Sequence, residues 1–291
     1  MPLSSWLRRL PVVAVVGGSL LAGGLAALAV AAPAASPIDG SYVFNANGWA
    51  GTLAIDNAES GMPDVTMYYT ERNSYEYLSG TWNPDNGTLT IARPLSGTVS
   101  QSYTLFLGNH IPGSPVFGGY FTESDTGTMR YGVLADNHLA PGTFRATTAR
   151  PATVHTAVPA NTVLPANTVA PAVTPAYDVP DWLFGLNEFD GNGWDGYLLF
   201  DPCYTPDTEM YYNALDNWEP IATHSYDAAT DTLTMVRPLS YGGVTQTYTM
   251  YLGTHRLDDN MMFGGYFTQS DTPGLKFAAY ATRDLSGGVG C

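Results

Sequence analysis

The chain carries the same residue pattern twice, and this repeat limits its fold more than any other feature. Asn47-Gly48-Trp49 recurs as Asn192-Gly193-Trp194. Later matches keep the same order and drift by one or two positions: Arg93-Pro94-Leu95-Ser96 with Arg237-Pro238-Leu239-Ser240, and Phe117-Gly118-Gly119-Tyr120 with Phe263-Gly264-Gly265-Tyr266. A conserved order of this kind indicates a tandem duplication. We therefore expect two domains of one fold, residues 37–138 and 185–291, each of ordinary domain size.

The segment between the repeats, residues 139–184, has a different composition. It is rich in Ala, Thr and Val, holds seven prolines and contains Pro-Ala-Asn-Thr-Val twice. Proline disfavours helices and sheet interiors, so this composition is typical of an extended, semi-rigid linker. The sequence thus predicts a Pro/Ala/Thr-rich spacer that separates the two domains.

The first 36 residues look like an export signal. Arg8 and Arg9 precede an apolar run from Leu10 to Val30, and Ala32-Pro33-Ala34 resembles a cleavage site. We expect a cleaved signal, a secreted or cell-surface protein and no membrane span after cleavage; an uncleaved anchor is the alternative, since the run is nearly long enough to cross a bilayer.

Charge and cysteine content limit the partners. Eleven basic and 26 acidic residues give a net charge of −15, and Lys276 is the only lysine. The chain therefore lacks the cations that neutralise phosphates, so nucleic acid is excluded as a partner. Cys203 and Cys291 suit an oxidising compartment, where they form one hypothetical disulfide, and their spacing predicts no metal site.

Alternating apolar residues predict eight strands in each repeat. Aromatic residues make up 12% of the chain, charged residues only 13%, and 31 glycines and 21 prolines favour turn-rich all-β structure. Short turns imply antiparallel neighbours, and a meander of eight strands loses its edges by closing on itself. We expect two tandem eight-stranded antiparallel up-and-down barrels, with strands in the first repeat at about 40–46, 49–56, 64–70, 75–82, 87–93, 101–108, 116–123 and 129–136.

Strand alternation also assigns side chains to the barrel interior. Arg93 shares a face with Leu89 and Ile91, so a cation points where apolar residues point. We predict a ligand-binding interior, lined by Trp49, Arg93, Tyr103 and Phe117 in the first repeat and by Trp194, Arg237, Tyr248 and Phe263 in the second. Each Trp–Arg pair either forms a structural cation–π lid or holds an anionic ligand, and the buried guanidinium needs a carboxylate from a ligand or from the protein.

The eight-strand meander, the glycine-rich hairpins and the late Phe117-Gly118-Gly119-Tyr120 strand resemble the calycin-type barrels, avidins more than lipocalins. The resemblance covers both repeats and implies an up-and-down barrel, either filled or holding one small ligand. Phe117 and Phe263 stand where avidins carry a tryptophan, so the resemblance implies a fold without implying biotin as the ligand.

Other chemistry-bearing residues favour ordinary structural roles. His110 and His255 follow the sixth strand, and Asp125 and Asp271 lie in a turn beyond the seventh, so a His–Asp dyad is not expected. The segment Asp190–Gly196 fails the EF-hand spacing and predicts a hairpin turn. Neither metal nor cofactor is expected.

The side of the strands opposite the core is rich in tyrosine. Tyr68, Tyr120, Tyr211 and Tyr266 could contact glycans or a second protein, or could simply form cross-strand pairs with threonine. We expect a non-enzymatic binding or surface-interaction protein whose partner is a small apolar or anionic ligand, or a glycan or protein surface. The alternatives are a barrel-cup enzyme of isomerase or cyclase type and a structural envelope component.

Overall fold

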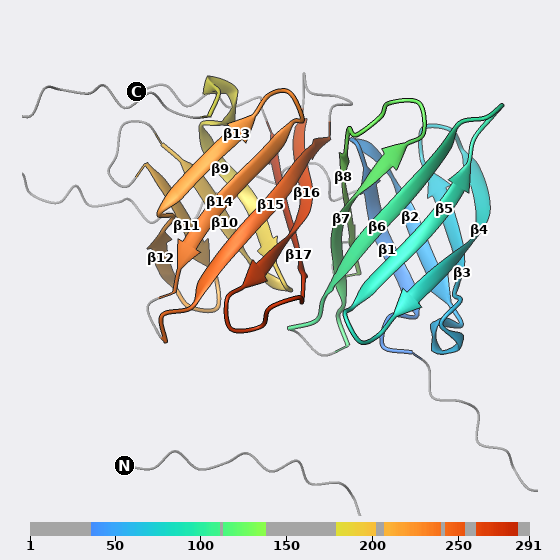
Figure 1. Cartoon of the computed structure of the whole chain (residues 1–291), viewed down its shortest axis with the longest axis horizontal. Coiled ribbons are helices and arrows are strands. Elements are labelled where there is room, and N and C mark those ends of the chain that lie inside the picture. The colour runs from blue at the N-terminus through green and yellow to red at the C-terminus, as the bar shows by residue number, and fades with distance from the viewer. Residues whose placement is uncertain are drawn as a thin grey trace, which may run out of the picture. The chain divides into compact units, whose positions relative to one another are not determined.

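The computed structural model contains two antiparallel β-sheets, one from each repeat (Figure 1). It describes residues 36–110, 113–137, 179–201, 207–239, 242–253 and 260–284. The predicted signal segment and nearly all of the predicted linker therefore lie outside the described residues, as do Cys203, Cys291 and His255. The protein is all-β, as the sequence predicts, with short 3-10 turns at Ala58–Ser60 and Asp181–Leu183.

The first repeat forms a closed eight-stranded up-and-down barrel, in which each strand pairs with its neighbours in sequence and β1 also pairs with β8. Observed and expected boundaries agree to within about two residues. The strands are β1 (Gly40–Ala46), β2 (Trp49–Asp56), β3 (Asp64–Tyr69), β4 (Ser74–Asn83), β5 (Thr88–Pro94), β6 (Ser100–Gly108), β7 (Val116–Glu123) and β8 (Tyr131–Asp136).

Local turn chemistry explains where these strands end. At the β1–β2 hairpin, Asn47 and Gly48 both have positive φ, 56° and 87°, as a tight two-residue hairpin requires. The Asn45 side chain fixes this turn, because its Oδ1 accepts a hydrogen bond from the Gly48 amide at 2.8 Å. The second repeat makes the same turn at Asn192 and Gly193, with Asp190 in place of Asn45.

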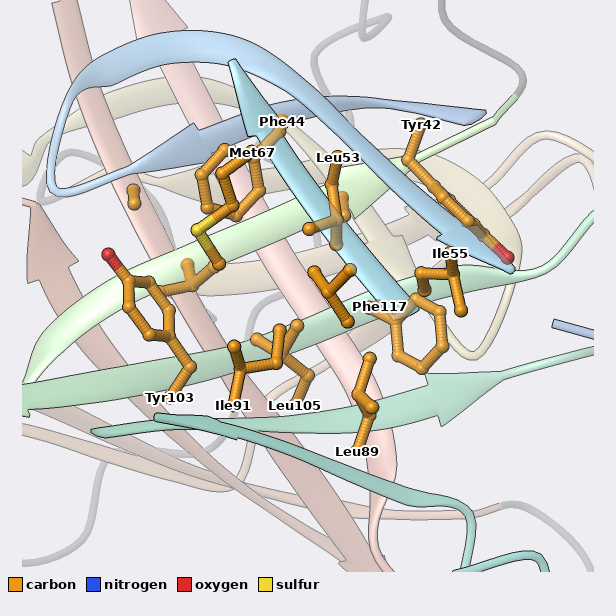
Figure 2. Close-up of a cluster of buried hydrophobic side chains, with 14 of the residues drawn as sticks. Tyr42, Phe44, Leu53, Ile55, Met67, Leu89, Ile91, Tyr103, Leu105 and Phe117 are labelled. Carbon is orange, nitrogen blue, oxygen red and sulfur yellow. The ribbon is translucent and has the colours of Figure 1, made fainter. Parts of the chain in front are cut away.

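The interior of the first barrel is filled by side chains. Alternate residues of the strands point inward, and Figure 2 shows such side chains converging, including Phe44, Leu53, Met67 and Tyr103, which are almost completely buried. Phe117 lies edge-on to Tyr42, with ring centroids 5.4 Å apart. This packing matches a barrel of eight strands, whose interior is just wide enough for its own side chains.

The second repeat differs from the prediction, because its sheet is open and has nine strands. The sheet order is β12-β11-β10-β9-β17-β16-β15-β14-β13, so β12 and β13, consecutive in sequence, are the two edges. The strands are β9 (Gly185–Gly191), β10 (Trp194–Phe200), β11 (Thr208–Tyr212), β12 (Asn217–Pro220), β13 (Thr223–Asp227), β14 (Thr232–Pro238), β15 (Thr245–Gly253), β16 (Asn260–Gln269) and β17 (Phe277–Asp284).

The ninth strand coincides with one additional residue in the second repeat. In the first barrel β4 is bent: its first half pairs with β3, up to Ser79, and its second half pairs with β5, from Gly80. Glu219 pairs with β11 as Glu76 pairs with β3, and His224 pairs with β14 as Gly80 pairs with β5. The segment from Glu219 to His224 is therefore one residue longer than the segment from Glu76 to Gly80. An additional residue in one strand bends it locally. By register, β12 and β13 stand where the first barrel has one strand.

The two sheets are in direct contact through β6, β7 and β8 of the first and β15, β16 and β17 of the second. Both belong to the same compact unit of the chain. The backbones approach so closely that a Cβ on Gly118 would lie 2.5 Å from the Ala279 carbonyl oxygen, and one on Gly264 would lie 2.2 Å from that of Val133. The repeats are therefore packed against one another, contrary to the expectation that the linker separates them.

Candidate functional site

Arg93, the inward cation predicted from the sequence, is held by an acid of the same barrel. Its Nε and Nη2 atoms donate to the two carboxylate oxygens of Glu76 on β4, which makes a bidentate ion pair. Its Nη1 donates to Gln101 Oε1 at 2.6 Å. The guanidinium carbon also lies 4.7 Å from the centroid of the Tyr69 ring, within cation–π distance. Arg93 thus has three protein partners, one each from β3, β4 and β6.

Two tyrosine hydroxyls and a glutamate extend this network. Tyr69 and Tyr103 share a hydrogen bond of 2.9 Å between their hydroxyl oxygens, and Tyr103 donates to Gln101 Oε1 at 2.8 Å. The Gln101 side-chain amide in turn donates to Glu123. We call Tyr69, Glu76, Arg93, Gln101 and Tyr103 the inner polar cluster of the first barrel.

Electrostatics in this cluster favour the charged ion pair and neutral tyrosines. Burial disfavours the Arg93 cation, but the hydrogen bonds that Arg93 donates to Glu76, together with the nearby tyrosines, outweigh this effect, so the pKa of Arg93 is raised. The hydrogen bond from Arg93 lowers the pKa of Glu76. Burial raises the pKa of Tyr103 well above its usual value. The arginine therefore stays charged, and Glu76 already neutralises it.

The second repeat builds the same cluster from the matching residues. Arg237 Nη2 donates to Glu219, and its Nη1 donates to Gln246 at 2.9 Å and to the Tyr212 hydroxyl at 3.2 Å. Tyr248 donates to Gln246 at 2.8 Å, as Tyr103 does to Gln101. One difference is that Arg237 Nε has no hydrogen-bond partner in this structure, whereas Arg93 Nε donates to Glu76.

The structure brings together only some of the predicted site residues. Arg93 with Tyr103, and Arg237 with Tyr248, meet in the inner polar clusters. Phe117 and Phe263 are buried in the apolar cores of the two repeats. The Arg72 guanidinium carbon lies 5.0 Å from the centroid of the Trp49 ring. Trp194 stacks on His110 of the first repeat, with centroids 3.6 Å apart.

Glu76 and Glu219, the acids that hold the two arginines, are not among the site residues predicted from the sequence. The sequence does contain a signal for them. Glu76 lies two positions before Leu78 on an expected strand, so alternation places it on the inward face. Both repeats have an inward acid and an inward arginine, so the sequence pattern indicates an ion pair inside each repeat.

Aromatic side chains cover part of the outer face of β3 and β4, on the opposite side of these strands from the inner polar cluster. On β3 and β4, Tyr68 lies beside Tyr75 with ring centroids 4.6 Å apart, and Tyr77 follows on the same face. Tyr75 and Tyr77 are 64% and 81% exposed, which is unusual for rings of this size. We call Tyr68, Tyr75 and Tyr77 the outer strip of the first repeat.

The second repeat carries a corresponding outer strip, formed by Tyr197, Tyr211 and Trp218. Tyr211 lies between the other two, with centroid distances of 6.1 Å to Tyr197 and 5.1 Å to Trp218. The Tyr211 hydroxyl donates to Asp216, as Tyr68 donates to Asn73. Tyr120 and Tyr266, the other two outward tyrosines predicted to contact a partner, instead lie between the two repeats, against Tyr251 and Phe106.

The remaining candidate residues form no site within the part of the chain that the structure describes. His110, Asp125 and Asp271 are exposed. Among the described residues, no group of three His, Cys, Asp or Glu could hold a metal ion. Within those same ranges no helix has the length and apolar character needed to cross a bilayer.

Comparison with known proteins adds no family. A search against protein-family models gave no match, and neither did a search of curated proteins.

Proposed function

We propose that this chain is an extracytoplasmic, non-enzymatic binding protein that contacts glycan surfaces through its two outer strips. The observation that carries the proposal is the exposure of Tyr75 and Tyr77 beside Tyr68. In the second repeat Tyr211 and Trp218, both half-buried, form the matching ring contact. The export signal predicted for the first 36 residues supports the location.

The state of the inner clusters argues for binding at the outside. A ligand carboxylate entering the first barrel would have to displace Glu76 from a bidentate pair with Arg93. The Arg93 side chain is almost fully buried and that of Glu76 is 27% exposed. Displacement would leave the partly buried Glu76 without its cation, at a cost of up to about 3–5 kcal/mol. A barrel-cup enzyme that holds an acidic substrate with Arg93 meets the same obstacle, which is why we place binding on the surface.

The chemistry of the outer strips favours a neutral saccharide. Tyrosine and tryptophan rings offer flat apolar faces, lose little conformational entropy on binding, and carry polar edges that form hydrogen bonds. Pyranose rings present matching faces of C–H groups surrounded by hydroxyls. A net charge of −15 disfavours anionic polymers. Two strips on one chain would add avidity on a polymer with repeated units.

We also propose a finer description of the fold, in which both repeats are calycin-like eight-stranded barrels. The support comes from the residues between β12 and β13. The Ile221 amide donates to the Thr208 carbonyl at 3.0 Å, and the Ala222 amide donates to the Val236 carbonyl at 2.8 Å. These two bonds continue the ladders of β11 and β14, so β12 and β13 would be the halves of one bent fourth strand.

Affinity electrophoresis in gels that contain a soluble neutral β-glucan, soluble starch or no polysaccharide tests the glycan proposal. We expect at least one polysaccharide to retard the protein. The variants Tyr75→Ala with Tyr77→Ala, and Trp218→Ala, should weaken that binding by about 10-fold or more, equivalent to about 1.4 kcal/mol. Met62→Ala is the matched control, because Met62 is 72% exposed and lies outside the strips. Equal retardation of the strip variants and the control would refute the proposal, as would the absence of retardation in every gel. If the partner is instead a protein surface, no gel should retard the protein.

A further inference from the structure

The contact between the repeats has approximate two-fold symmetry. Gly118 approaches Ala279, and Gly264, which matches Gly118 in the repeat, approaches Val133, which matches Ala279. Exchanging the two repeats therefore maps each of these contacts onto the other. This is how the interface of a two-fold dimer is built, with the same patch used on both sides.

The aromatic contacts obey the same exchange. Phe106 packs on Tyr266 at 4.8 Å, and the matching pair, Tyr251 and Tyr120, packs at 5.0 Å. A cation covers each pair. Arg130 lies 4.7 Å from the Tyr120 ring centroid and donates to the Tyr251 hydroxyl at 2.9 Å.

Lys276, the chain's only lysine, takes the place of Arg130 on the other pair. Its Nζ lies 4.2 Å from the Tyr266 ring centroid and 5.0 Å from that of Phe106. Cation–π contacts of this kind contribute about 0.5–2 kcal/mol each. The interface thus combines two copies of one recognition unit, related by the exchange of repeats.

One pair of residues breaks this symmetry. Tyr280 donates a hydrogen bond to Asp136, and both side chains are buried. In the strand register, Leu134 of the first repeat occupies the position of Tyr280 in the second. Likewise, Thr282 of the second repeat occupies the position of Asp136 in the first. The acid and the tyrosine therefore meet only when a first repeat faces a second repeat. Two first repeats would place Asp136 opposite Leu134, and two second repeats would place Tyr280 opposite Thr282.

Burying a carboxylate against an apolar side chain is strongly unfavourable. We propose that the β6–β8 face of the first repeat and the β15–β17 face of the second are a heterotypic docking pair that holds without the covalent linker. A first repeat then recognises a second repeat, in its own chain or in a second copy of it, and rejects another first repeat. Within one chain the linker supplies a high effective concentration, so internal docking dominates at low protein concentration.

The test uses the full chain with a protease recognition site inserted after Ala160, in the predicted linker. After cleavage we expect the two fragments to elute together in size-exclusion chromatography with light scattering, as a one-to-one complex. Cleaved protein is then mixed with an isotope-labelled cleaved sample and analysed by native mass spectrometry. Labelled first repeats should pair with unlabelled second repeats, and pairs of two first repeats should be absent.

Two variants separate docking from folding. Arg130→Glu with Lys276→Glu removes both cations from the aromatic pairs at the edge of the interface. Fragments of this variant should keep their far-ultraviolet circular dichroism and dissociate at least ~10-fold more readily. Thr90→Glu, on the exposed outer face of β5, is the matched control and should dock normally. Separate elution of folded wild-type fragments would refute the proposal, and so would pairs of first repeats as abundant as mixed pairs. The test measures only the docking of the two repeats, so the result of the test does not depend on whether the protein binds glycans.

Discussion

The Asp190 carboxyl makes the stability of the protein depend on pH, and the first repeat supplies the substitution that tests this. Asp190 and Asn45 stabilise matching hairpins in the two repeats. The Oδ1 atom of each accepts a hydrogen bond from a glycine amide at 2.8 Å. Replacing Asp190 with asparagine therefore keeps the turn and removes only an ionisable group. Asp190 is 4% exposed and lies opposite Tyr280 on β17.

Burial raises the pKa of Asp190 from 3.8 to about 7, and the nearby carboxylates of Asp136 and Asp195 add to the rise, while the Gly193 amide opposes it. A raised pKa means that the folded state holds the proton more tightly than the unfolded state. The protein is then most stable, as far as this group is concerned, below about pH 4, and loses that stability as the pH rises to about 7. Because one pKa unit corresponds to about 1.4 kcal/mol, the whole change amounts to about 4 kcal/mol.

Urea denaturation of the wild type and Asp190→Asn, followed by tryptophan fluorescence between about pH 4 and pH 8, measures this effect. The two proteins should have similar free energies of unfolding near pH 4. The variant should become more stable than the wild type as the pH rises, by about 2–4 kcal/mol at pH 8. Asp125→Asn, which neutralises an exposed carboxylate in a turn, is the control and should leave the pH profile unchanged. Parallel profiles for the wild type and Asp190→Asn would show that this carboxyl ionises freely in the folded protein.

Two further predictions concern the barrel interiors. Glu76→Gln should lower the free energy of unfolding by about 1–3 kcal/mol at neutral pH, because the charge opposite Arg93 is lost. The hydrogen bond from Arg93 lowers the pKa of Glu76, so the stability this acid provides is present above about pH 4.5 and is lost as the pH falls through the folded pKa. Wild type and variant should therefore converge in acid, and a constant difference down to pH 3 in urea denaturation would contradict this. Gly51→Ala should destabilise the first barrel by about 1–3 kcal/mol, since a Cβ there would lie 1.9 Å from the Tyr68 carbonyl oxygen. Gly196→Ala should do the same in the second repeat, and an unchanged melting temperature in calorimetry for either variant would show that the strands can move apart.

The closed barrel of the first repeat could be predicted from sequence because its signals are local. Alternation over six to ten residues places Leu53 and Ile55 inside, and Asn47-Gly48 carries the positive φ that a tight hairpin needs. The inward position of Arg93 follows from the same alternation. The partner of Arg93 could be predicted only by applying strand alternation to Glu76 as well.

The break between β12 and β13 in the second repeat coincides with a single additional residue. One insertion between Glu219 and His224 leaves the hydrophobic pattern almost unchanged, because a strand can bend there without exposing its core side. Periodicity alone does not register such an insertion, whereas the hydrogen-bond ladder does.

The contact between the repeats was hidden for a different reason. The sequence pattern places Gly118 and Gly264 in the seventh strand of their respective repeats, and their close approach to the other sheet is a tertiary property. An outward glycine in a strand centre does suggest close backbone approach. Combined with outward Tyr120 and Tyr266, it could have indicated an interface instead of a free surface.

The central claim is that a ligand meets the outer strips and not the barrel interiors, and one comparison in the same polysaccharide gels tests it most directly. The outward variant carries Tyr75→Ala and Trp218→Ala. The inward variant carries Glu76→Leu and Arg93→Met, which replaces the buried ion pair with apolar groups and so leaves no charge unpaired. The account predicts about 10-fold or greater loss of binding in the outward variant and wild-type retardation of the inward one. Loss of binding in the inward variant, with the outward variant unaffected and both folded, would contradict it.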